Sequence, residues 1–237
     1  MRIIVIIPAF NEGRSIGQVV ADIPEGLVEE VVVVNNGSTD ETEANARAAG
    51  ATVLREPKKG YGWACLRGIE YVKTKSPDIV VFLDGDYSDH PEEMTELVRP
   101  IARGEADLVI GSRMIGNREP GAMLPQAVVG NRLACLLMRL FWRAQFTDLG
   151  PFRAIRFESL RDLDMADRTF GWTIEMQIKA IKAGLRYTEI PVSYRRRVGV
   201  SKITGTVSGT VKASAKILFM IFRHAFGGRG DSQRRET

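Results

Sequence analysis

The stretch Val80-Val81-Phe82-Leu83-Asp84-Gly85-Asp86-Tyr87-Ser88 joins an apolar run to two carboxylates that are one residue apart. The run is rich in β-branched residues and predicts a buried strand that ends just before the acidic pair. Open α/β sheets bind ligands at the carboxyl ends of their strands, and a turn at Gly85 would let both carboxylates face one hard cation. An isolated Asp-Gly-Asp is also typical of a solvated acidic turn, so the rest of the chain must decide.

Similar strand patterns recur on both sides of this stretch. Residues 2–7 (RIIVII) and 30–34 (EVVVV) are buried-strand runs, each followed by a polar loop and a helical pattern that begins near Ser15 or Glu41. Residues 52–55 and 107–110 predict two more strands, and a helix passes through about residues 68–72. Strands that alternate with helices predict an α/β fold with a mostly parallel sheet covered on both faces.

The amino-acid composition is that of a soluble protein without a membrane span or a cysteine-based metal or redox site. The chain has 237 residues, of which 44% are hydrophobic and 26% charged, as is ordinary for a soluble protein. No stretch has the roughly 18 uninterrupted apolar residues of a membrane span, and the N-terminus shows no signal-peptide pattern, so we expect a cytoplasmic location. Cys65 and Cys135 belong to no paired metal or redox motif. With only two histidines, any metal is expected to take oxygen ligands.

Charge is distributed unevenly along the chain. Residues 195–237 contain ten Lys/Arg and two acidic residues, a net charge of +8, whereas the whole chain has +4 and the remainder therefore −4. A basic end predicts an anionic partner such as phosphate or a membrane surface. The sequence contains no recognisable nucleic-acid-binding motif, so nucleic acid is not expected as a partner.

Two common nucleotide-binding patterns are missing. The loop after the first strand, residues 11–17 (NEGRSIG), lacks the closely spaced glycines of a dinucleotide fingerprint, and no Gly-Lys-Ser/Thr phosphate loop occurs. A bound diphosphate would have to be held by a metal and by basic side chains, and Asp84 and Asp86 are candidates to hold that metal.

Three motifs together resemble the family 2 glycosyltransferases with the GT-A fold: residues 8–12 (PAFNE), 35–40 (NNGSTD) and 84–86 (DGD). The resemblance implies that a nucleotide-diphosphate sugar binds with Mg²⁺ or Mn²⁺ held by Asp84 and Asp86. Most relatives carry acidic residues where this chain has Asn35 and Asn36, which leaves the base open. The residues implied to surround the nucleotide are Pro8, Phe10, Glu12 and Asn36.

Two further positions match the family. Lys59 and Gly60, in the loop Lys59-Gly60-Tyr61-Gly62, resemble a segment near the donor, although the same residues suit an ordinary helix entry. Arg113 follows the strand at residues 107–110, where a guanidinium is suited to bind phosphate in two contacts. It would otherwise be a surface charge.

The second half narrows the resemblance to the polyprenyl-phosphate hexose transferases, through residues 147–155 (TDLGPFRAI), 170–177 (FGWTIEMQ) and 191–202 (PVSYRRRVGVSK). This implies Asp148 and Glu175 at the reaction centre. The arginine that precedes the helix near Gly130 in that subgroup is replaced here by about Gln126, and Arg132 is its candidate substitute. Structural roles stay open for all of these residues. The implied phosphate and acceptor ligands are Arg132, Arg153, Arg197, Ser201 and Lys202.

The expected reaction is an inverting single displacement. A phosphate monoester acceptor is largely dianionic at neutral pH and needs little general-base help, whereas an alcohol acceptor would need Asp148 to accept its proton. The alternatives are a glycosyltransferase with a small soluble acceptor, a nucleotidyltransferase and a non-catalytic sugar-nucleotide-binding module.

Two apolar segments with basic flanks, residues 122–146 and 217–222, favour peripheral membrane contact, with buried helices or a homodimer interface as alternatives. We expect a GT-A domain over residues 1–204. Residues 205–237 are expected to form a basic amphipathic helix and a disordered tail.

Overall fold

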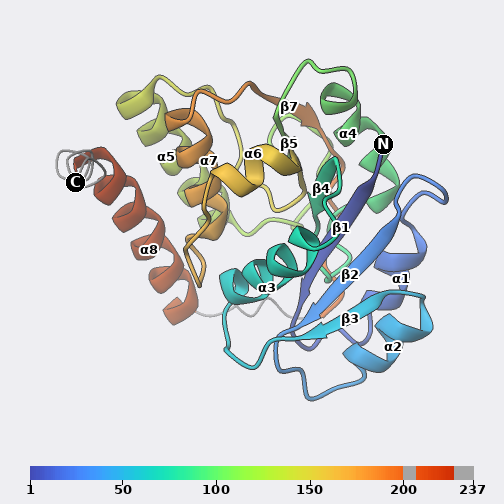
Figure 1. The fold of residues 1–237 in the computed structure, drawn as a ribbon. Coiled ribbons are helices and arrows are strands. Elements are labelled where there is room, and N and C mark those ends of the chain that lie inside the picture. Colours follow the sequence, from blue (N-terminus) through green and yellow to red (C-terminus); the bar gives the residue numbers. More distant parts are fainter. Residues whose placement is uncertain (200–206, 227–237) are drawn as a thin grey trace, which may run out of the picture.

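A single mixed sheet with helices on both faces organises the computed structural model, which describes residues 1–199 and 207–226 (Figure 1). The strand order is β3-β2-β1-β4-β6-β5-β7. Neighbouring strands run parallel except that β6 is antiparallel to both β4 and β5. The expected mostly parallel sheet is confirmed, with two strands, β6 and β7, that the sequence patterns did not predict. The strands are β1 (Ile3–Ala9), β2 (Glu30–Asn35), β3 (Thr52–Arg55), β4 (Ile79–Phe82), β5 (Leu108–Ser112), β6 (Arg153–Arg156) and β7 (Tyr187–Pro191).

The helices form two layers around this sheet (Figure 1). On one face lie α1 (Ile16–Ala21), α2 (Thr42–Ala48) and α4 (Met94–Ala102), the last preceded by the 3₁₀ turn Pro91–Glu93. The other face carries α3 (Tyr61–Lys73), α5 (Pro125–Trp142), α6 (Phe157–Asp162), α7 (Trp172–Lys182) and α8 (Val207–Phe226).

The strand sequence explains why both faces are covered. All seven residues of β1 are buried, and its side chains alternate between the two cores: Ile4 and Ile6 face one, Ile3, Val5 and Ile7 the other. Because β1, β2 and β4 are parallel, their carboxyl ends lie at one edge of the sheet. The polar loops that follow these strands therefore meet at that edge.

Helix α8 is docked on the rest of the fold. It packs against α5 and α7, and its Met220 and Ile221 are buried in the larger core. Lys216 forms an ion pair of 2.6 Å with Asp167, in the loop before α7. The expected C-terminal helix is thus present. The predicted boundary at residue 204 and the end of the predicted segment 205–237, from residue 227 onward, lie outside the described residues. Within the described segments, no helix is both long and apolar enough to cross a bilayer.

Candidate active site at the carboxyl edge of the sheet

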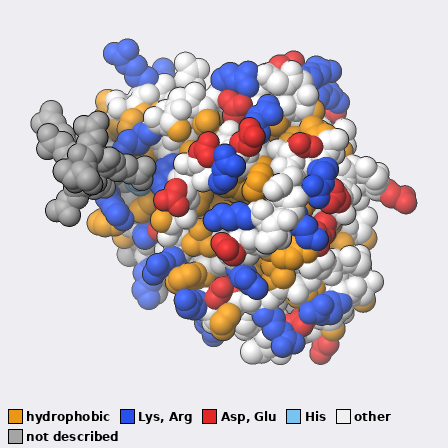
Figure 2. Space-filling view, in the orientation of Figure 1, with side chains coloured by type: hydrophobic (Ala, Val, Ile, Leu, Met, Phe, Trp, Pro, Cys, Tyr) orange, Lys and Arg blue, Asp and Glu red, His pale blue; other side chains and the backbone are white. Residues whose placement is uncertain are grey.

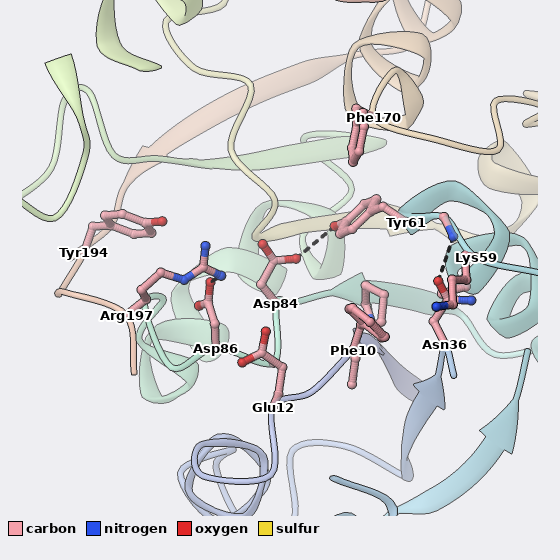
Figure 3. A pocket seen from close by; sticks show the side chains of 15 residues that line it. Phe10, Glu12, Asn36, Lys59, Tyr61, Asp84, Asp86, Phe170, Tyr194 and Arg197 are labelled. Atoms are coloured by element: carbon pink, nitrogen blue, oxygen red, sulfur yellow. Dashed lines mark hydrogen bonds and ion pairs between the residues drawn. The ribbon is translucent and has the colours of Figure 1, made fainter. Parts of the chain in front are cut away.

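A cavity of about 340 Å³ opens where β1, β2 and β4 end; we call it the acidic cavity (Figure 3). The loops after these strands bring together residues from three distant parts of the sequence. The cavity therefore assembles most of the predicted donor and metal site. The predicted residues that line it are Pro8, Phe10, Glu12, Asn36, Lys59, Gly60, Asp84, Asp86 and Arg197.

Asp84 follows β4 and the buried Leu83, and its carboxylate points into the cavity. The Tyr61 hydroxyl donates a hydrogen bond of 3.0 Å to its Oδ1. Burial, followed by the negative charge of Asp86, raises the pKa of Asp84 to about 7, against the opposing effects of Arg197 and Tyr61. Two carboxylates that share one site in this way favour a bound cation.

Asp86 is buried, with 3% of its surface exposed, and both of its oxygens have partners. Oδ1 accepts hydrogen bonds from the Ser88 backbone N–H, at 2.9 Å, and from the Ser88 hydroxyl. Oδ2 is ion-paired with the Arg197 guanidinium. Ser88 thus orients the carboxylate of Asp86 through the opposite oxygen.

The donor set fits a hard divalent cation. Carboxylate oxygens are the protein ligands that Mg²⁺ and Mn²⁺ prefer, and Mg²⁺ is commonly held by one or two carboxylates together with phosphate oxygens and water. In the described ranges 1–199 and 207–226, no three His, Cys, Asp or Glu side chains form a metal-binding cluster. Asp84 and Asp86 would accordingly supply the protein ligands, and a diphosphate and water the others.

Asn36 shapes the loop on the opposite side of the acidic cavity. Its Nδ2 donates to the carbonyl oxygens of Glu56 and Lys58, at 3.0 and 2.8 Å, and its Oδ1 accepts from the Gly60 N–H at 2.8 Å. Lys59 lies 5.5 Å from the centre of the Phe10 ring. The amide of Asn36 therefore holds the loop that carries Lys59.

Gly60 occupies a position that only glycine fits. Its φ is 147°, and a Cβ there would lie 2.4 Å from the Arg168 carbonyl oxygen. The close approach joins the loop before α3 to the loop before α7. Glycine at this position is thus explained by the contact between the two loops.

A second cavity of about 640 Å³ adjoins the first; we call it the apolar cavity because apolar residues of α5 and α8 line it beyond the acidic pair. The two share Tyr61, Asp84, Phe170, Tyr194 and Arg197. Its outer walls come from the start of α5 and the middle of α8, including Leu124, Gln126, Ala127, Gly130, Ala213 and Ile217.

Arg113 lies at the apolar cavity, where Asp148 fixes it. Asp148 is fully buried and accepts hydrogen bonds of 2.8 Å from the Arg113 backbone N, Nε and an Nη atom. The Arg113 guanidinium also lies 5.0 Å from the centre of the Tyr194 ring. Asp148 itself lines neither cavity, so it acts on the site through Arg113.

The structure places three other predicted residues away from both cavities. Arg153 is fully buried and donates to the carbonyl oxygens of Leu149, Gly150 and Thr173. Glu175 accepts from the backbone N–H groups of residues 166 and 167 and pairs with Lys179.

Arg153 and Glu175 bury their charged groups in contacts within the protein. This burial does not fit the predicted phosphate-binding role of Arg153 or the predicted reaction-centre role of Glu175. Arg132 is exposed on α5. The predicted ligands Ser201 and Lys202 lie outside the described residues.

Apart from Phe10, the aromatic residues of the site were not among the predicted ones. Tyr61, Phe170 and Tyr194 line both cavities, and Figure 3 shows Tyr61 and Phe170 on one side of the acidic pair with Tyr194 beside Arg197. Each occurs within a stretch that resembles the family, which was the available signal. Aromatic residues in such stretches are more often core residues, and this masked their role.

Comparison with known proteins places the chain in a family. A model of "Glycosyl transferase family 2" matches residues 4–164. The chain belongs to glycosyltransferase family 2. An uncharacterized glycosyltransferase of Mycobacterium tuberculosis is 36% identical over 212 residues, covering 88% of this chain and 93% of the relative. The undecaprenyl-phosphate mannosyltransferase of Micrococcus luteus is 30% identical over 225 residues, covering 88% and 90%.

A solved glycosyltransferase structure shares the fold. Glucosyl-3-phosphoglycerate synthase from Mycobacterium tuberculosis, in complex with Mn²⁺, UDP and phosphoglyceric acid, has a TM-score of 0.77 at 25% identity. The match covers 95% of this chain and 78% of that one. The same enzyme has been crystallised with Mg²⁺ and UDP. The expected GT-A fold and glycosyltransferase class are confirmed.

Proposed function

We propose that this family 2 glycosyltransferase transfers a hexose from a nucleotide-diphosphate sugar to a polyprenyl phosphate or a similar phosphorylated acceptor, with Mg²⁺ or Mn²⁺. One observation carries the proposal: the cavity with the acidic pair opens directly onto a larger cavity that has apolar residues of α5 and α8 in its lining. Arg197 lies where the two meet, and Arg113 and Arg196 line the larger one. A charged donor and an acceptor with an apolar part would then meet at Asp84.

The acidic cavity suits the donor. Phe10, Glu12 and Lys59 lie around the space for the nucleotide, and Asp84 and Asp86 would hold the cation on the diphosphate. When bound, the cation neutralises the charge that develops on the departing nucleoside diphosphate. The structural neighbour's complexes with Mn²⁺ or Mg²⁺ and UDP support this assignment.

The apolar cavity suits a phosphorylated acceptor. Arg113 lines this cavity and is held in place by Asp148, which positions its guanidinium as a charge partner for a phosphate. A relative is named for undecaprenyl phosphate, and a structural neighbour was solved with phosphoglyceric acid. The two acceptors share a phosphate. The apolar walls on α5 and α8 favour the lipid.

A phosphate acceptor also agrees with the environment of Asp148. Its carboxylate is fully buried and bonded to Arg113, so it is poorly placed to accept a proton from an alcohol. A dianionic phosphate needs no such base. Positioning and charge neutralisation by the arginines then supply the catalysis of an inverting transfer.

The outer surface of α5 and α8 suits a bilayer. Of the ten large hydrophobic residues exposed in the described structure, seven lie on these helices, and rings of Phe141 and Phe226 join the helices at 5.6 Å. Figure 2 shows hydrophobic side chains interleaved with Lys and Arg at the edge where α8 lies. The seven are Val129, Leu133, Leu136, Leu140, Phe219, Phe222 and Phe226.

The basic residues of this surface favour an anionic bilayer as its partner. Neither α5 nor α8 contains an acidic residue, and five exposed basic side chains lie on or next to them: Arg132, Arg139, Arg143, Lys212 and Arg223. Apolar side chains flanked by Lys and Arg bind anionic bilayers. We expect peripheral contact with the cytoplasmic face of the membrane, where a lipid phosphate would reach the apolar cavity between the same helices.

The transfer is tested by offering labelled UDP- and GDP-hexoses with Mn²⁺ and either undecaprenyl phosphate or 3-phosphoglycerate. Labelled lipid is the expected product, with release of nucleoside diphosphate. Labelled phosphoglycerate alone would indicate a small soluble acceptor. Pyrophosphate release in a parallel reaction with UTP or GTP and a hexose 1-phosphate would indicate a nucleotidyltransferase, and absence of any metal-dependent turnover would indicate a binding module.

Membrane contact is tested by co-sedimentation with anionic liposomes at low salt. The double variant Leu136→Glu, Leu140→Glu should stay in solution, whereas Ile115→Glu, which changes an exposed apolar residue elsewhere, should still bind. A wild-type protein that fails to bind would overturn the membrane assignment. A dimer in light scattering that the double variant dissociates would assign the surface to a homodimer instead.

A further inference from the structure

We propose that Arg197 exchanges partners during the reaction: it neutralises Asp86 before the metal binds, and it turns to the donor diphosphate once the metal has taken its place. The inference rests on the proposed function, because it assumes a metal and a diphosphate in the acidic cavity. It gives Arg197 a second role besides phosphate binding, as the counter-ion of Asp86 in the metal-free site.

The ion pair lies where a metal would bind. The Arg197 guanidinium contacts Oδ2 of Asp86, the oxygen that Ser88 leaves free, and Figure 3 shows the guanidinium between Tyr194 and the acidic pair. Asp86 is almost fully buried, so its charge would be costly without a partner. A cation and Arg197 therefore compete for one carboxylate oxygen.

The backbone of Arg197 is fixed, so the exchange needs only a side-chain movement. The Arg195 N–H donates to the Ser88 carbonyl oxygen and the Val198 N–H to the Asp86 carbonyl oxygen, both at 2.9 Å. Arg195 also donates through Nε to the Tyr87 carbonyl oxygen at 2.8 Å. These contacts hold the segment that carries Arg197 along the loop that carries Asp86.

The guanidinium has donors to spare for a phosphate. Nε of Arg197 is buried and has no hydrogen-bond partner among the described residues. Unsatisfied buried donors are rare, and a guanidinium presents five N–H groups in a fork that matches phosphate oxygens. Arg197 lines both cavities, so a diphosphate at Asp84 and Asp86 would lie within reach of this unused donor.

Competition for Asp86 has a thermodynamic consequence. Metal alone must displace Arg197 and leave it without a partner, whereas metal with diphosphate provides a new partner. Arg197 should thus weaken the binding of Mn²⁺ alone and strengthen the binding of Mn²⁺ together with UDP. This coupling makes each of the two ligands favour the other, beyond their direct coordination.

The exchange is tested by measuring free Mn²⁺ by electron paramagnetic resonance in titrations of the full chain. Arg197→Gln should bind Mn²⁺ alone about tenfold more tightly than wild type, the order expected for loss of a partly buried ion pair. With UDP present the order should reverse. Arg197→Lys keeps the charge without the fork and should lie between them.

Arg186→Gln is the matched control. It breaks another arginine–aspartate pair, with Asp107 at 2.9 Å, at the opposite edge of the sheet, and should leave both affinities unchanged. Thermal melting confirms that each variant is folded. Equal or weaker binding of Mn²⁺ alone by Arg197→Gln would overturn the exchange, as would Arg197→Lys identical to wild type, because net charge alone would then explain the effect.

The result is separable from the proposed function, because these titrations contain neither sugar nor acceptor. A chain that transfers hexose but shows no tighter Mn²⁺ binding in Arg197→Gln would refute only the exchange. Tighter binding in a chain that transfers no hexose would support the exchange and refute only the transfer.

Discussion

The walls of the two cavities differ in how their charged residues are used. In the acidic cavity, Glu12, Lys59, Asp84 and Asp86 all reach the lining. Beyond Asp84, the charged residues among the described ones that line the apolar cavity are all arginines: Arg113, Arg196 and Arg197. Asp148, Arg153 and Glu175 line neither cavity and are buried in contacts within the protein. Loops after parallel strands expose polar side chains at the sheet edge, whereas β6 and α7 bury theirs to hold the chain in place.

Loss of Asp86 should have the largest effect on this comparison. Asp86→Ala removes a predicted metal ligand and leaves Arg197 without its partner. We expect transfer to fall by at least about a thousandfold, since metal catalysis contributes several kcal/mol. Full activity without added metal would contradict the assignment, and circular dichroism checks that the variant is folded.

Glycines that line the two cavities provide a second contrast. Gly60, at the acidic cavity, has a φ of 147° and no room for a Cβ. Gly130, at the apolar cavity, lies in α5, and a Cβ added to it would have no atom within 4 Å. Gly60→Ala should lower the free energy of unfolding by about 2–3 kcal/mol. Gly130→Ala should raise it by about 0.5–1 kcal/mol, because alanine favours a helix. Urea denaturation measures both, and equal effects would contradict the difference between the walls.

The residues that line the acidic cavity were largely predictable, because short stretches of sequence identify them. A β-branched run followed by polar residues marks the end of a strand, and three such ends in a parallel sheet must meet. The elements around the apolar cavity have no comparable sequence pattern. β6 is four residues long with arginine at each end, so no hydrophobic periodicity identifies it.

The roles of residues on that side depend on contacts far along the chain. Asp148 meets Arg113, 35 residues away, and Glu189 of β7 accepts the backbone N–H groups of residues 147 and 148. A motif names such residues without saying whether they face the substrate or another side chain. That distinction needs the tertiary structure.

Asp148→Asn examines a residue that acts through another. An amide cannot hold the Arg113 guanidinium through two charged contacts, so the acceptor should bind about 30-fold more weakly, which corresponds to about 2 kcal/mol. Binding of Mn²⁺ with UDP should be unchanged, because Asp148 does not line the acidic cavity. A fall in kcat at unchanged acceptor KM, with an altered pH profile, would instead indicate a general base.

The pH dependence of metal binding should show the smallest effect, and it concerns the acidic wall alone. Burial and Asp86 raise the pKa of Asp84 to about 7, so below that pH the carboxyl is protonated in the metal-free protein. A cation must displace this proton, and Mn²⁺ affinity should therefore fall by about tenfold for each pH unit below about 7 and level off above it.

Titrations at pH 6, 7 and 8 without nucleotide measure this slope. Asp84→Asn should bind Mn²⁺ weakly at all three values, with the slope lost. In Asp148→Asn the slope should persist, because the carboxylate of Asp148 lines neither cavity and is bonded to Arg113. Affinity that does not change between pH 6 and pH 8 in the wild type would mean that Asp84 is already ionised there, and that Arg197 and Tyr61 outweigh the burial of its charge.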